Sequence, residues 1–367
     1  MSSYKSVVPR TQLASYGPGV EVNFDLLHDG ESIVPGSLFL TGELDITCAT
    51  ARDGTLEHYM DPEAGVGAFL ENVITRCDVF QEVITNYGRL CKHNAMLQYS
   101  PDQRCAGLMN TCEMRPPNVR TAGLFVDSSA PGTAWSFCHK PIVAINNMSG
   151  PLSSTTSGRI QFSFKCPSTN KVFFGADSAD LTAYKFTNLQ LHYKTELVEG
   201  QGPVSVNIVQ DTQKLIATSR VTIMNTFPDL VDKVVVSFAQ VTTEQNAQQN
   251  SLVCQYMPIK RISWVYNDVS NRLVSYNIES AEELVLSGLS AMKAVGVAMD
   301  VRDKLAIFTQ DPAHSVSDKF CIGLTLGQQM DFSRSGLGVT VELGDNVIQN
   351  QGQYYAFFFA YGSKVIA

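Results

Sequence analysis

The sequence is poor in charged residues. Asp, Glu, Lys and Arg make up 17% of its 367 residues, against roughly 25% in an average soluble domain. Apolar residues make up 44%, so a sizeable core can form and the chain is not disordered. Ser, Thr, Asn and Gln take the place of the missing charges. Such a surface suits a protein that is largely covered by neighbours.

Clustered basic residues and long apolar runs are also missing. The net charge is −8, and no run of Lys and Arg is present that could neutralise phosphates, which argues against sequence-specific binding of nucleic acid. No window approaches 18 apolar residues, so we expect no transmembrane helix.

Motifs of common enzymes are absent. The sequence contains no G-x-G-x-x-G, no P-loop and no G-x-S-x-G elbow. The histidines form no H-x-H or H-E-x-x-H pair, and they are His28, His58, His93, His139, His192 and His314. An H-x-H pair places two imidazoles on one face of a strand, where they can bind a metal. Its absence argues against metal enzymes built on paired β-sandwiches.

Nine cysteines are present, and without the apolar stretch of a signal peptide we expect them to be reduced thiols. They are Cys48, Cys77, Cys91, Cys105, Cys112, Cys138, Cys166, Cys254 and Cys321. The best metal candidates are Cys91, His93, Cys105 and Cys112, whose side chains suit zinc. However, Cys91 and His93 lie two apart on an expected helix and would point apart. We therefore predict buried or loop thiols, and no metal.

Paired carboxylates give no better candidate for catalysis. Glu282/Glu283 and Asp61/Glu63 are interpreted as solvated acids at helix starts or turns, since general acid–base catalysis needs carboxylates in a cleft. We predict no catalytic residue, no cofactor and no enzymatic activity.

Strand patterns dominate the chain. In 186–198, Leu189, Leu191 and Tyr193 alternate with Gln190 and His192, as on a strand with one buried face. Further strands are expected at 38–49, 79–84, 158–166, 220–227, 232–241, 259–268, 274–280, 319–327, 337–344 and 353–361. Many short strands separated by turn residues favour an all-β sandwich or barrel.

The final strand pattern, QYYAFFFAYG, is aromatic on both faces. Tyr355, Phe357, Phe359 and Tyr361 would face one way, and Tyr354, Ala356, Phe358 and Ala360 the other. We expect one set to fill its own sandwich, and the set with two alanines to approach a neighbouring domain or subunit. The counterpart 186–198 has a polar second face, so we predict that only the final strand is buried on both faces.

Helix signals are few. Residues 86–97 form one amphipathic pattern, with Asn86 as a possible N-cap. Residues 280–292 form another, where Ser280 and Glu283 have the spacing of a capping box. A third pattern, over 64–75, can already be strand at its end.

The order of elements repeats, with strands, a short helix and a long last strand in each half. We expect a terminal arm at 1–17, either disordered or docked, a first domain at 18–198 and a second at 199–367. The segment 99–137 contains four prolines and little periodicity, so we expect a long inserted loop there.

The order of four stretches resembles major capsid proteins of the double jelly-roll lineage, which includes tectiviruses and adenovirus hexons. They are VPGSLFLTGELDIT followed by DPEAGVGAFLENVITRCDVFQEVITNYGRLCKHNAML, SGRIQFSFKCPSTNKVFFG with AYKFTNLQLHYKTELVE, the strands of the second half, and QYYAFFFAYGSKVIA. The resemblance covers about residues 18 to 365 and depends on order and spacing rather than on one decisive motif.

The resemblance implies two consecutive eight-stranded jelly rolls, each with a short helix. It further implies a viral major capsid protein that forms homotrimers of six rolls, which tile an icosahedral shell. Neighbouring trimers, penton and minor capsid proteins would be its partners. The arm at 1–17 would be a possible contact to an internal membrane. The protein would be made in the host cytoplasm and end in the virion.

Two alternatives remain open from the sequence. A minor capsid or spike protein, or a carbohydrate-binding β-sandwich, would share the strand pattern. An enzyme with two metal-binding barrels (a bicupin) would share the architecture, but the missing H-x-H argues against it.

Overall fold

We analysed a computed structural model of the chain. It describes residues 2–48, 58–61, 63–98, 119–120, 123–125, 134–175, 181–198, 202–246, 249–267, 272–280, 283–284, 286–287 and 320–366.

The second half forms a sandwich of two antiparallel sheets. Its strands in the described part are β15 (Val204–Ile216), β16 (Arg220–Asn225), β17 (Val231–Gln240), β18 (Ile259–Asn267), β19 (Leu273–Ile278), β20 (Cys321–Met330), β21 (Leu337–Leu343) and β22 (Tyr354–Ile366). One sheet has the order β15-β22-β17-β20 and the other β16-β21-β18-β19. The first, eighth, third and sixth strands therefore share one sheet, and the second, seventh, fourth and fifth share the other.

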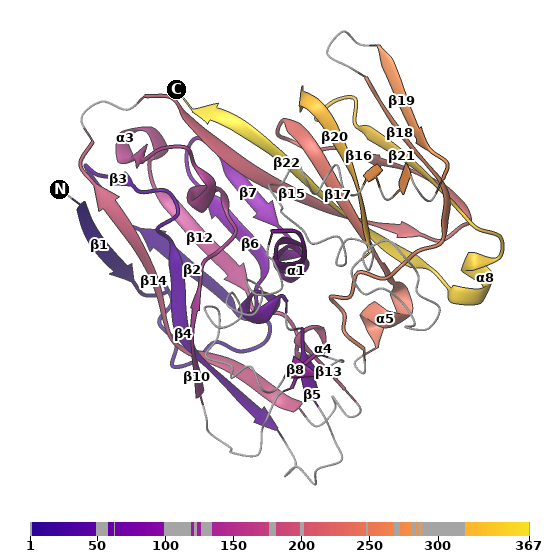
Figure 1. Ribbon diagram of the computed structural model, residues 1–367. Coiled ribbons are helices and arrows are strands. Elements are labelled where there is room, and N and C mark those ends of the chain that lie inside the picture. The colour runs from indigo at the N-terminus through magenta and orange to yellow at the C-terminus, as the bar shows by residue number, and fades with distance from the viewer. Residues whose placement is uncertain are drawn as a thin grey trace.

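The first half repeats this order. Its main strands are β1 (Ser2–Val7), β2 (Glu21–Leu26), β4 (Phe39–Cys48), β6 (Glu71–Arg76), β7 (Gln81–Ile84), β10 (Ala134–His139), β12 (Ile160–Lys165) and β14 (Leu181–Glu196). The sheets run β1-β14-β4-β10 and β2-β12-β6-β7, which is again first-eighth-third-sixth and second-seventh-fourth-fifth. Two facing sheets with this crossing order are a jelly roll, and Figure 1 shows the two rolls next to each other.

Short strands extend the first half. β3 (Ser32–Ile33) pairs with β14 and with β11 (Leu152–Ser153). A separate small sheet has the order β13-β5-β9-β8. Its strands are β5 (His58–Met60), β8 (Val119–Arg120), β9 (Gly123–Phe125) and β13 (Phe173–Gly175).

The N-terminal residues belong to the first roll. Ser2–Val7 pairs with β14 in antiparallel register, from Ser2 opposite Glu196 to Val7 opposite Leu191. The arm expected at 1–17 was either disordered or docked, and over the residues of β1 it is docked. Lys5 forms an ion pair with Glu31, which helps to hold the strand in place.

The expected loop at 99–137 is wrong at its C-terminal end. Residues from Ala134 onward form β10, which pairs with β4 from Ala134 opposite Asp45 to His139 opposite Leu40. The sequence did not reveal this strand for two reasons. It follows a proline-rich stretch, and its six residues are too few to show a clear periodicity. β8 and β9 also lie in this segment, and the rest of it lies outside the described residues.

The expected helix at 86–97 is α1 (Tyr87–Gln98), whose start leaves Asn86 just outside it. The third pattern is η1 (Gly65–Phe69), followed directly by β6. In the second pattern Glu283, Leu284, Leu286 and Ser287 are helical, the Glu283 N–H donates to Ser280 Oγ at 3.1 Å, and residues 288–292 lie outside the described part.

Further short helices connect the strands. They are η3 (Ala144–Asn147), α3 (Ser154–Ser157), α4 (Thr169–Val172), α5 (Val241–Gln245) and α8 (Val347–Gln351). Within the described ranges, no helix is long and apolar enough to cross a membrane.

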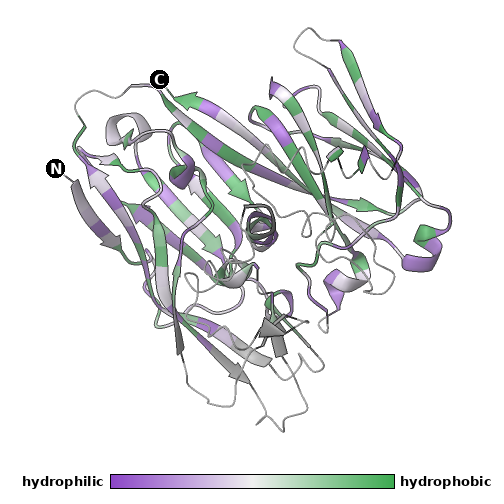
Figure 2. Cartoon of the chain, in the orientation of Figure 1, coloured by the Kyte–Doolittle hydropathy of each residue, from purple (hydrophilic) through white to green (hydrophobic). Residues whose placement is uncertain are grey.

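Two apolar cores hold the chain together, and alternating bands of apolar and polar residues run along many strands (Figure 2). One core lies inside the second roll. The other fills the first roll and includes Val206, Ile208, Phe357 and Phe359 from the second half. The second roll therefore packs the outer face of its β15–β22 sheet against the first roll.

The final strand is buried on both faces, as expected. From Ala356 to Ala360 each residue is at most 1% exposed, whereas in β14 the buried positions between Tyr184 and Lys194 are separated by partly or fully exposed ones. The expected orientation of its two faces is wrong. Ala356 and Ala360 lie in the core of the second roll together with Trp264, so bulky side chains of the facing sheet fill the space beside the alanines.

Candidate functional site

Helix α1 lies between the two rolls (Figure 1) and is the centre of their contact. From Tyr87 to Ala95 every residue of the helix is buried. Tyr87 and Leu90 belong to the core of the first roll, while Arg89, Lys92 and His93 are at most 2% exposed. The helix contains no acidic residue, so its buried cations must find partners elsewhere in the chain.

Arg89 connects α1 to the second half. Its guanidinium donates to the carbonyl oxygens of Val253 and Ser251 at 2.7 and 2.6 Å and forms an ion pair with Glu244. The same group stacks on Phe357 of β22, with Cζ 3.8 Å from the ring centroid. These hydrogen bonds and the stacking offset most of the free energy that burial of the guanidinium costs.

Lys92 makes a second connection. Its ammonium lies 2.7 Å from Asp61 Oδ2, and both side chains are only 1% exposed. Asp61 also accepts from Asn250 Nδ2 at 2.7 Å and from the N–H groups of Glu63 and Ala64. Burial alone would raise the pKa of Asp61, but Lys92 and these donors hold the pKa below its ordinary value. The carboxylate thus joins α1, the start of η1 and the second half.

Asp61 corrects an expectation from the sequence. It does start a helical turn, as its bonds to Glu63 and Ala64 show, but it is not solvated. The partner residues lie 31 and 189 positions away, so no local pattern could have revealed the pair. A usable signal was the helix itself, which carries Arg89 and Lys92 without any acid.

Two carboxylates connect the rolls, and each roll supplies one of them to the backbone of the other. Glu82 of β7 accepts the N–H of Val209 on β15 at 2.8 Å and that of Ala144 at 2.7 Å. Asp211 of β15 accepts the N–H groups of Thr85 and Asn86, both at 2.8 Å, at the start of α1. The side-chain amide of Asn86 also donates to Asp211, so Asn86 is held by a carboxylate from the second half.

The environment of both carboxylates favours the protonated form. Burial raises the pKa of Glu82 to about 8, against the opposing effect of the two N–H donors. Burial likewise raises the pKa of Asp211. These groups fix the backbone of one roll to that of the other.

Of the four zinc candidates, Cys91 and His93 lie in the described residues, and they face different neighbours. His93 packs edge-on against Phe359, with ring centroids 4.8 Å apart, and burial lowers its pKa to about 3. Cys91 instead faces η1, where a Cβ on Gly67 would lie 2.4 Å from its sulfur. Cys105 and Cys112 lie outside the described residues. Over the described ranges, no group of three or more His, Cys, Asp or Glu could hold a metal ion.

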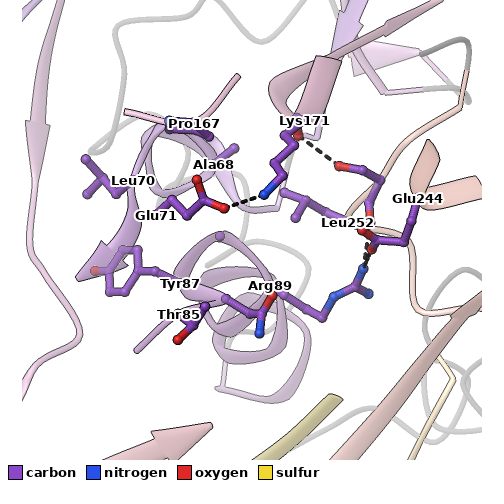
Figure 3. A pocket seen from close by; sticks show the side chains of 13 residues that line it. Ala68, Leu70, Glu71, Thr85, Tyr87, Arg89, Pro167, Lys171, Glu244 and Leu252 are labelled. Carbon is purple, nitrogen blue, oxygen red and sulfur yellow. Dashed lines mark hydrogen bonds and ion pairs between the residues drawn. The ribbon is translucent and has the colours of Figure 1, made fainter. Parts of the chain in front are cut away.

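One small cavity lies beside the start of α1. Its volume is about 50 Å³, far below the roughly 300–1,000 Å³ of ordinary ligand pockets. Figure 3 shows Lys171 pointing to Glu71 on one side and Arg89 pointing to Glu244 on the other. Both pairs are satisfied within the chain, and the junction is built to hold two rolls together.

No family model and no curated protein sequence matches the chain. Solved structures do match over its whole length. The Faustovirus major capsid protein has a TM-score of 0.58 at 10% identity, covering 100% of this chain and 90% of the other. The chain has a double jelly-roll fold. A chain of the Sputnik virophage structure gives 0.59 at 12% identity, covering 100% and 86%. The mavirus major capsid protein gives 0.54 at 11% identity, covering 99% and 87%.

Proposed function

We propose that this chain is a viral major capsid protein. The observation that carries the proposal is the match of the entire chain, both rolls and their order, to most of the length of the Faustovirus and mavirus major capsid proteins. A chance sandwich would match one roll, or both in another arrangement. The function is then self-assembly, and the protein is a structural component of the virion rather than an enzyme.

Three copies would form one building block. Each chain contributes two rolls with the same strand order, so a trimer has six similar units and approximates a hexagon. Such blocks can tile a shell together with penton and minor capsid proteins. The low content of charged residues supports this, because interface cores are depleted of Lys, Glu and Asp.

The division into rolls fits this role. We propose that the first roll ends near residue 198 and that the second comprises 199–367. The first roll also includes β1, which the sequence assigned to an arm at 1–17. Because Lys5 pairs with Glu31 and β1 pairs with β14, these residues serve the roll, and contact of the arm with a membrane has little support.

The test is the assembly state of the purified full-length chain. We expect light scattering to give three times the monomer mass, or larger shells, and negative-stain images to show hexagonal blocks. A monodisperse monomer at micromolar concentration would contradict the proposal. In purified particles from infected host cells, the chain should be the dominant band, whereas a minor capsid or spike protein would be a weak one.

A further inference from the structure

A polar hollow lies on the outer face of the first roll, over the sheet β2-β12-β6-β7. Its volume is about 390 Å³, within the roughly 300–1,000 Å³ of ordinary ligand pockets. Each lining residue lies inside a described segment, away from the ends of that segment. Besides Phe24, the hollow is lined by six polar residues, which are Arg10, Thr11, Asn23, Asp25, Arg76 and Gln161.

Three neighbouring strands supply the floor of the hollow. In β2 buried positions alternate with half-buried or exposed ones, so Asn23 and Asp25 face outward. Asp25 lies opposite Gln161 of β12, and Gln161 lies opposite Arg76 of β6. Arg76 Nη2 donates to Gln161 Oε1 at 2.6 Å, and Gln161 Nε2 donates to Asp25 Oδ1 at 3.2 Å. These hydrogen bonds fix the three side chains in one row across the sheet.

The segment before β2 supplies the other wall. The Arg10 N–H donates to the Asn23 carbonyl oxygen at 2.7 Å. Tyr16, which is buried, donates its hydroxyl to the Thr11 carbonyl at 2.9 Å and accepts the Leu13 N–H at 3.2 Å. The backbone that carries Arg10 and Thr11 is therefore held in place before any ligand arrives, which lowers the cost of binding.

The two arginines of the hollow have unused donors. Within the described ranges, no residue accepts a hydrogen bond from the Arg10 guanidinium, and Gln161 is the acceptor for Arg76. Each guanidinium has five N–H donors and stays charged at ordinary pH. Asp25 does not neutralise them, because it already forms an ion pair with Arg159. The hollow therefore has an excess of positive charge.

This arrangement selects an anion. Guanidinium groups match the oxygens of phosphate in bidentate geometry. The net charge of the whole chain is −8, so binding of an anion depends on a local excess of positive charge such as this one.

The hollow also offers more than a phosphate group needs. Asp25 accepts one hydrogen bond at Oδ1, from Gln161, and one at Oδ2, from Arg159. A carboxylate has about four lone-pair sites, so Asp25 can accept further hydrogen bonds from hydroxyl groups. A bare anion would not use this acceptor and would be repelled by its charge.

We propose that this hollow binds the phosphate group of a small molecule that also carries hydroxyl groups, such as a sugar phosphate. Arg10 and Arg76 bind the phosphate oxygens, Thr11 and Asn23 add neutral donors, and Asp25 accepts from the hydroxyl groups. The proposal goes beyond the assembly of the shell and does not depend on it, because all of these residues belong to the first roll of one copy.

Calorimetric titration of the full-length chain tests the ligand class. The probe is ribose 5-phosphate, compared with inorganic phosphate and with ribose. We expect ribose 5-phosphate to bind at least about tenfold more tightly than inorganic phosphate, which corresponds to about one further good hydrogen bond, and ribose to give no binding heat. Absence of binding by ribose 5-phosphate, or inorganic phosphate that binds equally tightly, would overturn the proposal.

Substitutions of the two arginines test the site. Arg10→Gln and Arg76→Gln should each weaken binding of ribose 5-phosphate at least about tenfold, because each removes a charged donor. Arg220→Gln is the matched control, since it removes the same charge from an exposed position at the start of β16 in the second roll. An Arg220→Gln chain that loses as much affinity would show unspecific attraction and overturn the site.

Asp25→Ala separates the two parts of the ligand. It should tighten binding of inorganic phosphate, because a negative charge is removed, and it should abolish the preference for ribose 5-phosphate. A preference that persists in Asp25→Ala would overturn the role of Asp25. Melting temperatures by circular dichroism check folding. Arg10→Gln removes no hydrogen bond of the described part of the chain, so this variant keeps the test valid even where another variant is less stable.

Discussion

Strands β14 and β22 hold the same place in their rolls, the eighth, yet only one of them is buried on both faces. Their inner faces are alike, with Leu191 and Tyr193 in β14 and Phe358 in β22 among the core residues. Their outer faces differ. Gln190, His192 and Lys194 face outward on β14, whereas Tyr355, Phe357, Phe359 and Tyr361 cover the first roll from β22.

The two outer faces differ because only that of β22 is covered within the folded chain. The outer face of β22 meets α1 within the same chain, so it is covered as the chain folds and can be fully aromatic. The outer face of β14 is open in a single copy. An aromatic face there would be an aggregation hazard, which its polar residues reduce.

Breaking the doubly buried strand should have the largest effect. Phe358 is 1% exposed within the core of the second roll. Phe358→Asp removes an aromatic side chain, which alone costs about 3–5 kcal/mol, and leaves a buried carboxylate without a partner. We expect loss of soluble folded protein, measured by expression yield and circular dichroism. Well-folded Phe358→Asp protein would contradict the burial of this face.

A smaller loss is expected at the outer face of β22. Arg89→Met keeps an apolar stem over Phe357 but removes the donors to Val253 and Ser251 and leaves Glu244 without this cation. Breaking such a buried pair costs about 3 kcal/mol, which urea unfolding would measure. A double-mutant cycle with Phe357→Leu isolates the stacking contribution, and a coupling near zero would show that Arg89 acts through its hydrogen bonds alone.

Much of this comparison was readable in the sequence, because alternation within one strand is a local property. The polar face of 186–198 and the two aromatic faces of 353–361 were both predicted and are confirmed. The orientation of the aromatic faces was not predictable, since it depends on Trp264 and on α1, which lie far away in the chain. β1 was missed as a strand because its inward residues are Ser3, Lys5 and Val7, and only pairing with β14 reveals it.

The contact that Glu82 makes with β15, the first strand of the second roll, can be tested by pH. Glu82 closes the β15 edge at Val209, and its pKa is raised to about 8 by burial. The folded chain therefore keeps a proton that the unfolded chain releases above about pH 4.5. The free energy of unfolding should fall as pH rises from about 4.5 to 8, by at most about 1.4 kcal/mol per pH unit from this group.

Glu82→Gln should flatten this pH dependence, because the amide does not titrate. Asp211, whose pKa is also raised, contributes in the same direction, so Asp211→Asn combined with Glu82→Gln should flatten it further. Urea unfolding between pH 5 and 9 measures the slopes. A slope that Glu82→Gln leaves unchanged would show that Glu82 is ionised in the folded chain across this range.

The smallest effect on stability is expected at the open face of β14. Lys194 lies partly exposed beside Tyr4, and its backbone pairing with β1 does not depend on its side chain. Lys194→Asp should change the free energy of unfolding by no more than about 0.5 kcal/mol, as surface substitutions usually do. A loss of stability in the isolated copy would instead mean that the outer face of β14 is already covered within the chain, and the contrast between the two strands would fail.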